Sequence, residues 1–286
     1  MKHLHTAVVA AATVCALSIS GTALAQSSGQ STDSTDRSGE GSGEYNVLGI
    51  EKARYDGAVP SDRPGFGDTV SLVPKGYFEM ESGLRYDNNQ GGGDSYTVPS
   101  SVLLRTGLTD NIEFRLGFDG YNFNKPGADG TGNASVGFKI HVADETTYTP
   151  AISIQPSISL PAGDDQVAAS KSEPGVNFIW AKSVSDKIGV GGNVNLFERC
   201  DGSDGNRKLE TAASISSSYS FSDRFGGYAE YYGIFSQVEG SKDVHAINGG
   251  VTFLATQHTQ FDTFVGTGLN DSTSNVFAGV GIAHLF

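Results

Sequence analysis

Charged side chains occupy every second position in several segments whose other positions are apolar. In GYFEMESGLRYD, Glu79, Glu81 and Arg85 alternate with Phe78 and Met80. Residues two apart point to the same face of an extended strand, so these charges would share one face. Such a face can pair its charges with one another, or it can line a water-filled passage and select ions by charge. Because both signs occur, the pattern implies neither a plain cation filter nor a plain anion filter.

Other segments repeat this pattern, and together they give candidates for a single polar face. The charged members are Glu79, Glu81, Arg85, Arg105, Glu113, Arg115, Asp119, Lys139, Glu230 and Asp262. Four tyrosines on the same face, which could contact an aromatic ligand, are Tyr77, Tyr121, Tyr228 and Tyr232. A charge network that stiffens the protein interior and the lining of a pore explain these residues equally well, and both can hold.

Catalytic chemistry finds little support in the sequence. Outer-membrane phospholipases pair a serine with a histidine on their outer wall, but His245 and His284 lack the His-x-Ser arrangement. His141 falls on the charged face and His258 in a short turn. The segment DGSDGNRKLE begins like a calcium loop, yet it lacks the acidic spacing and the glycine at its sixth position. We therefore expect no enzymatic activity, no metal site and no cofactor.

The N-terminal residues 1–25 have the three parts of a secretory signal peptide. Lys2 precedes the apolar run AVVAAATVCAL, and the small residues ALA end at Ala25. Val14 stands before Cys15 where a lipoprotein signal uses a small residue, so lipidation is not expected. Cleavage would change the net charge from −13 to −14 and leave Cys200 as the single cysteine. The acidic balance argues against a nucleic-acid partner, and a single cysteine excludes an internal disulfide.

Residues 26–74 are expected to form a flexible linker followed by a segment that lies either inside the following domain or in the periplasm. The stretch 26–45, QSSGQSTDSTDRSGEGSGEY, is too poor in apolar residues to order itself and predicts a flexible linker. Residues 46–74 either fold into the interior of the following domain as a plug or stay in the periplasm.

Residues 75–286 contain about twelve segments of alternating polarity, which predict an all-β, membrane-spanning antiparallel β-barrel. Short connections such as LTDN and FSDR alternate with longer ones such as NNQGGGD and ERCDGSDGNRK. Short turns at one end and long loops at the other are typical of outer-membrane barrels. A soluble all-β sandwich or lectin is the alternative, which the loop asymmetry and the inner charges disfavour. An even number of strands predicts both chain ends in the periplasm. The alternation separately predicts that the charged face points into the barrel lumen.

The final segment, VFAGVGIAHLF, carries alternating apolar residues to a terminal aromatic. Val280, Ile282 and Phe286 resemble the assembly signal with which bacterial outer-membrane barrels commonly end and which the barrel assembly machinery reads. The segment departs from that pattern at His284, where an aromatic is more usual.

A more specific resemblance begins at residues 61–85, SDRPGFGDTVSLVPKGYFEMESGLR. This DRPGF box and VPKG turn, the hairpin LLRTGLTDNIEFRLGF, and the segments SISLPAGD and VTFLATQHTQFDTFVGTGLND resemble the family of meta-pathway phenol-degradation proteins. The resemblance implies an outer-membrane channel or transporter for small, hydrophobic or aromatic molecules, in contact with outer-membrane lipid and lipopolysaccharide. The alternative is a structural or surface-exposed barrel whose loops bind a partner, without transport.

Overall fold

The computed structural model describes residues 41–89, 92–200, 206–237 and 240–286. The predicted signal peptide and most of the predicted linker lie outside these residues. The described residues form strands and connections only, and none of them belongs to a helix long and apolar enough to cross a membrane.

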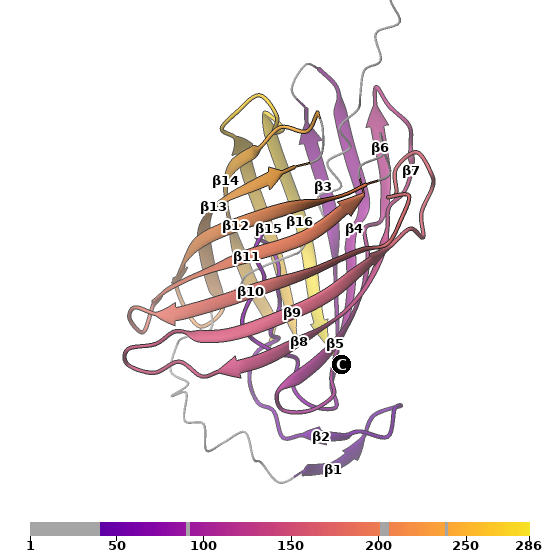
Figure 1. Ribbon diagram of the computed structural model, residues 1–286. Helices are drawn as coiled ribbons and strands as arrows, with labels where there is room; N and C mark the ends of the chain where they lie inside the picture. The colour runs from indigo at the N-terminus through magenta and orange to yellow at the C-terminus, as the bar shows by residue number, and fades with distance from the viewer. Residues whose placement is uncertain (1–40, 90–91, 201–205, 238–239) are drawn as a thin grey trace, which may run out of the picture.

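The described residues contain sixteen strands, which follow one another along the chain (Figure 1). They are β1 (Gly41–Tyr45), β2 (Glu51–Ala53), β3 (Phe78–Asn88), β4 (Asp94–Gly107), β5 (Ile112–Phe118), β6 (Tyr121–Lys125), β7 (Gly130–Thr131), β8 (Ala134–Ala143), β9 (Ala151–Leu160), β10 (Glu173–Ser183), β11 (Ile188–Cys200), β12 (Arg207–Ser220), β13 (Phe225–Ser236), β14 (Val244–Thr256), β15 (Thr259–Gly268) and β16 (Val276–Leu285).

Strands β3 to β16 form one antiparallel sheet that closes on itself. From β8 to β16 consecutive strands pair with one another, and β3 pairs with both β4 and β16. Both β5 and β6 pair with β4, so they are two halves of one interrupted strand, and β7 and β8 make another. The result is a closed barrel of twelve strands, which confirms the predicted fold class.

The outward face of this barrel is apolar because every strand turns large hydrophobic side chains away from the lumen. Each of the twelve strands contributes at least one exposed member: Leu84, Leu104, Leu116, Phe138, Ile158, Phe178, Val194, Ile215, Tyr231, Ile247, Val265 and Val280. An exposed apolar band that continues around a whole molecule fits a lipid environment rather than water.

The two ends of the barrel differ in the length of their connections. Two residues join β14 to β15 and four join β12 to β13 at one end, whereas twelve residues join β9 to β10 at the other. The carboxyl end of β16 lies at the short-turn end, where the Phe286 amide donates to the Phe78 carbonyl at 2.8 Å. The β1–β2 hairpin lies below the same end, outside the barrel (Figure 1).

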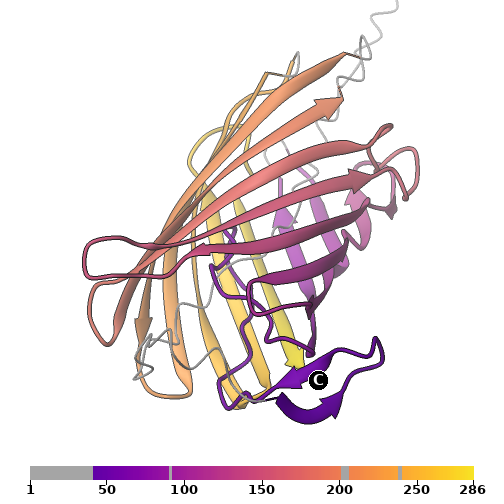
Figure 2. The same cartoon turned by 60° about the horizontal axis from the view of Figure 1, so that its bottom comes forward.

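The hairpin corrects one sequence-based expectation, because residues 41–45 of the predicted flexible linker form β1. The turn to β2 is held by the Asn46 side chain, whose Oδ1 accepts the amides of Leu48 and Ile50 at 2.9 and 3.0 Å. These local bonds supply order that the apolar content of the linker could not. After β2 the chain turns into the barrel and passes through its interior before β3 begins (Figure 2).

Candidate functional site

The barrel interior holds residues 59–73, VPSDRPGFGDTVSLV, which we call the inner segment. Its two prolines and two glycines do not favour a regular strand. Val59 and Val73, at its two ends, are each 1% exposed and pack together with Ala283 and Leu285 of β16. Between these apolar anchors the segment is held by polar contacts with the barrel wall.

Asp62 is the centre of the polar contacts. Its carboxylate accepts hydrogen bonds from Arg115 Nη1 at 2.6 Å and from Lys139 Nζ at 2.8 and 2.9 Å. Arg105 Nη1 lies 3.7 Å away. Burial alone would raise the pKa of Asp62, but the three cations hold that pKa well below its usual range. The inner segment therefore places a carboxylate where the wall presents three positive charges.

Arg105 connects the same cluster to the acidic residues of the wall. Its guanidinium donates to Glu79 Oε2 at 2.7 Å, to Glu81 Oε1 at 3.1 Å and to both oxygens of Glu113 at 2.9 and 3.0 Å. It also donates to backbone carbonyls of the inner segment, at Pro60 and Ser71. The Arg105 side chain has no exposed surface, so wall and inner segment share one buried charge network.

Arg63 binds the wall at β15, two strands from β3. Its Nε and Nη2 donate to the two carboxylate oxygens of Asp262 at 2.9 and 3.0 Å, a bidentate pair with both side chains almost fully buried. Gly83 and Gly281 leave the space for it, since a Cβ at either position would overlap the Arg63 guanidinium. We call these two glycines the arginine notch.

Glu230 on β13 holds the middle of the inner segment. Its carboxylate accepts the backbone amides of Phe66 at 2.6 Å and Gly67 at 2.8 Å, and the Asn248 side chain at 2.9 Å. Two positions along the same strand face, the Tyr232 ring stacks on the Phe66 ring with centroids 4.2 Å apart and planes 6° apart. Aromatic side chains of Tyr228, Phe264 and Phe277 complete this part of the interior.

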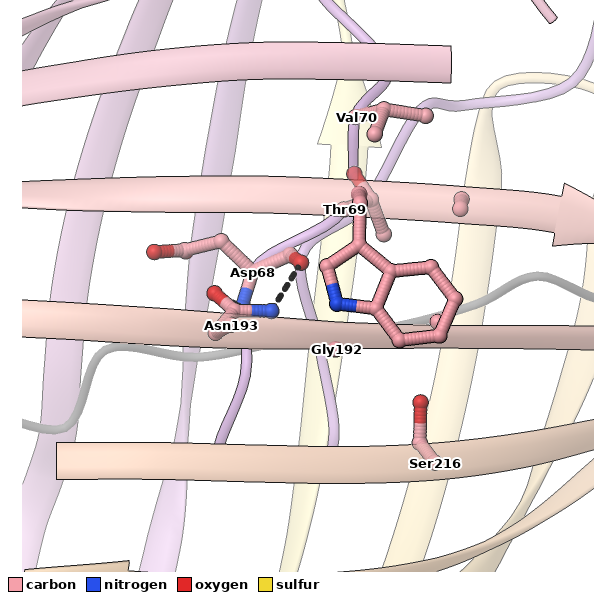
Figure 3. Close-up of a pocket in the computed structure, with 9 residues that line it drawn as sticks. Asp68, Thr69, Val70, Gly192, Asn193 and Ser216 are labelled. Carbon is pink, nitrogen blue, oxygen red and sulfur yellow. Dashed lines mark hydrogen bonds between the residues drawn. The ribbon is translucent and has the colours of Figure 1, made fainter. Parts of the chain in front are cut away.

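Side-chain amides bind Asp68 on the side of the barrel shown in Figure 3. Asp68 Oδ2 accepts Asn177 Nδ2 at 2.9 Å and Gln155 Nε2 at 3.1 Å, while Asn193 exchanges two hydrogen bonds with the Asp68 backbone. Burial and the nearby Asp62 carboxylate raise the pKa of Asp68 to about 7. The pocket between the inner segment and this wall, which also has Trp180 in its lining, is too narrow to admit a water molecule.

The structure brings eight of the ten predicted charged residues into the interior as buried side chains: Glu79, Glu81, Arg105, Glu113, Arg115, Lys139, Glu230 and Asp262. Arg85 and Asp119 stand apart from this cluster. Arg85 pairs with Asp87 at 2.7 Å and lies over the Phe277 ring at 4.6 Å. The Asp119 amide donates to the Asn133 carbonyl at 2.9 Å. Whether these residues take part in conduction stays a prediction.

The four predicted tyrosines separate into three places. Tyr228 and Tyr232 lie in the interior, 9% and 7% exposed, and Tyr77 packs against Tyr55 next to the apolar anchors. The prediction for Tyr121 is wrong, because Tyr121 pairs with Val98 and packs against Phe123, both more than 40% exposed on the outward face. The strand is interrupted at residues 119 and 120, and this break inverts the alternation on which the prediction rested.

The sequence interpretation missed the wall contacts of the inner segment itself. Asp62, Arg63, Phe66 and Asp68 all bind the barrel, yet they lie in a segment without strand periodicity. The usable signal in the sequence was the set of charged residues beside a proline and two glycines in DRPGFGD, whose two aspartates and arginine are buried in the structure. A second network, in which Arg199 pairs with Glu173 and Glu210 at 2.7 and 2.8 Å, was also not anticipated.

The predicted histidines are dispersed over the barrel. His245 Nδ1 shares a hydrogen bond with the Tyr231 hydroxyl on the outer face. His284 Nδ1 shares a hydrogen bond with the Thr259 hydroxyl. His141 lies 2.9 Å from Asp144, near Ser153, whose hydroxyl donates to the Val70 carbonyl of the inner segment. Among the described residues no group of three or more His, Cys, Asp or Glu side chains could hold a metal ion.

Comparison with known families identifies the chain. The family described as "Putative MetA-pathway of phenol degradation" matches residues 61–286, which include the inner segment from Ser61 onward and the whole barrel. The chain belongs to this family. The match of the phenol-degradation family starts at the DRPGF box, so the polar part of the inner segment belongs to the matched region. No curated protein is significantly similar to the chain.

Solved structures share the barrel of this phenol-degradation family member at low sequence identity. An outer membrane channel from Pseudomonas putida F1 is 14% identical, with a TM-score of 0.57 over 79% of this chain and 100% of that chain. The NanC porin is 8% identical, with a TM-score of 0.50 over 73% of this chain and 98% of that chain. At these identities the likeness establishes a common outer-membrane barrel fold.

Proposed function

We propose that this chain is an outer-membrane channel for small solutes, and that the inner segment closes its lumen in the state described. Three findings support the proposal: the closed barrel with its apolar outer band, the membership in the family, and the fold shared with outer-membrane channels. The observation that carries it is the polar attachment of the inner segment across the interior, from Asp262 on one wall to Asn177 on another.

Polar attachment suits a segment that must leave its place. A hydrogen bond to a charged group contributes only about 1.5–3 kcal/mol net, because water replaces it when the segment is released. The segment takes part in the two buried apolar clusters through Val59, Val73 and Phe66, and the residues between them are attached mainly by polar contacts that water can replace. We therefore assign residues 59–73 the role of a plug.

The transported molecules are proposed to be small and aromatic or hydrophobic. The family description supports this class, and so do the aromatic rings of Tyr228, Tyr232, Phe264 and Phe277 that line part of the interior. We place the chain in the outer membrane with both ends in the periplasm, in contact with lipopolysaccharide and inserted by the barrel assembly machinery. The short-turn end, where β16 finishes, would then face the periplasm.

Conductance in a planar lipid bilayer tests the proposal. We expect the refolded protein to conduct weakly and a variant lacking residues 59–73 to conduct several times more, because the plug and its buried contacts are gone. A variant lacking the β1–β2 hairpin, residues 41–53, is the matched control and should conduct like the unchanged protein. If the plug deletion inserts but carries no more current than the control, the channel function fails.

A structural barrel without transport is the second candidate. The observation that favours it is the dense charge network, because buried ion pairs also stiffen an interior that never opens. Equal uptake of labelled phenol or toluene by cells with and without the protein, together with a silent plug deletion, would favour this candidate.

A further inference from the structure

The contacts of Phe66 and Gly67 with β13 define a chemical pattern that a free molecule could reproduce. At this place the plug presents one aromatic ring to Tyr232 and two N–H donors to the Glu230 carboxylate, at 2.6 and 2.8 Å. Glu230 and Tyr232 stand two residues apart, so both point from β13 into the lumen. The wall therefore offers a ring-stacking surface next to a hydrogen-bond acceptor.

We propose that Tyr232 and Glu230 form a solute-binding site, and that Phe66 and Gly67 are its internal occupants. The ligand class that fits is a small aromatic ring carrying a hydrogen-bond donor, with the ring on Tyr232 and the donor on Glu230. This inference rests on the proposed channel function, and it adds that solute and plug compete for one site. Binding of the solute then favours release of the plug, and release of the plug favours binding.

The geometry supports competition rather than simultaneous binding. The Phe66 ring covers the Tyr232 face in a nearly parallel stack, which leaves no room for a second ring on that face. Both Glu230 oxygens already accept plug amides, while Asn248 keeps the carboxylate oriented through its own bond at 2.9 Å. Phe66 itself is only half-buried whereas Tyr232 is 7% exposed, so a solute reaches Phe66 before it reaches the ring beneath.

Competition between plug and solute predicts how much the apparent affinity for the solute changes when the plug is weakened. The apparent dissociation constant of the solute equals its intrinsic constant divided by the fraction of barrels whose site is free. An aromatic stack contributes about 0.5–1.5 kcal/mol beyond its buried area, and 1.4 kcal/mol corresponds to tenfold in an equilibrium constant. Phe66→Ala should therefore tighten apparent binding about threefold to tenfold, because it weakens only the internal competitor.

The experiment measures binding of p-cresol to the full-length refolded protein by isothermal titration calorimetry. Toluene has the ring without the donor, and cyclohexanol has the donor without the ring, so both should bind at least threefold more weakly. Tyr232→Ala should reduce p-cresol affinity about tenfold, whereas Tyr232→Phe should retain most of it. Tyr231→Ala, on the same strand but 38% exposed on the outer face, is the matched control and should bind normally. Heat-modified mobility on detergent gels verifies that each variant is a folded barrel.

Opposite signs for Phe66→Ala and Tyr232→Ala would establish the shared site. Equal p-cresol affinity for Tyr232→Ala and Tyr231→Ala would overturn it, and so would an unchanged affinity for Phe66→Ala. These outcomes are independent of conductance. If the plug deletion conducts but p-cresol binding does not depend on Tyr232, the channel function is supported and the solute-binding site is refuted. If p-cresol binding follows the expected pattern but the barrel never conducts, the solute-binding site is supported and the channel function is refuted.

Discussion

The bidentate pair of Arg63 and Asp262 provides the sharpest test of plug release. It is a direct charge pair between the plug and β15, and its side chains are 4% and 0% exposed. Replacing one partner leaves the other charge buried without compensation as long as the plug stays in place. Such a change costs about 3–5 kcal/mol in a buried pair. The open state is spared this cost, because there the remaining charge meets water.

Asp262→Ala and Arg63→Ala should therefore each shift the ratio of open to closed barrels by a factor of about 10² to 5 × 10³. Single-channel recordings in a planar bilayer measure this ratio as the open probability. A second measurement is the rate at which maleimide modifies Ser61→Cys in a Cys200→Ser background, since Ser61 is 1% exposed while the plug is docked. The open probability and the modification rate should rise together.

The double variant Arg63→Ala/Asp262→Ala decides between this reasoning and a general loosening of the barrel. It removes both charges and leaves none uncompensated, so its open probability should lie below that of either single variant. Additive effects in the double variant would refute the reasoning, and so would single variants that label and conduct like the unchanged protein.

Three further changes test other contacts. Gly281→Val should open the barrel to a similar degree as Arg63→Ala, because the valine side chain would fill the arginine notch. Single-channel recordings that match those of the unchanged protein would show that the notch is not needed. Arg115→Ala in the plug-deleted barrel should shift ion selectivity toward cations, because the negative charge of Glu113, 2.7 Å from Arg115, becomes less compensated. An unchanged reversal potential in a salt gradient would speak against a role of Arg115 in conduction. Deletion of Phe286 should lower the yield of inserted, heat-modifiable barrel while export continues, because its amide bonds Phe78 where the sheet closes; equal yields would mean that the terminal aromatic is incidental.

The fold could be predicted because alternation of polarity is a local property of each strand. Glu113 and Arg115 face inward and Leu116 outward for the same reason that any strand alternates, and the sequence displays this directly. Tyr121 shows the limit of the method, since the interruption at residues 119 and 120 inverts the alternation without a change in polarity to mark it. The presence of charges inside was thus accessible from the sequence, whereas their partners were not.

The charge pairs of the candidate site depend on the path of the inner segment, which shows no regular alternation of polarity. Arg63 and Asp262 are 199 positions apart, and Asp62 and Lys139 are 77 apart. No local pattern relates such positions, because only the passage of the chain through the closed barrel brings them together. The DRPGF box was visible as a family resemblance, but its physical meaning required the threaded arrangement.

The arginine notch ties the evolution of three distant positions together. Gly83 and Gly281 belong to the neighbouring strands β3 and β16, and they accommodate one side chain of a segment outside the sheet. An added Cβ at Gly281 would meet the Arg63 side chain, so a larger residue there becomes acceptable once position 63 is small, whereas Gly83 must also stay small because of the Val280 carbonyl. Positions 63 and 281 should therefore vary together among relatives while position 83 stays small, and this joint pattern would indicate which barrels hold their plug by the arginine pair.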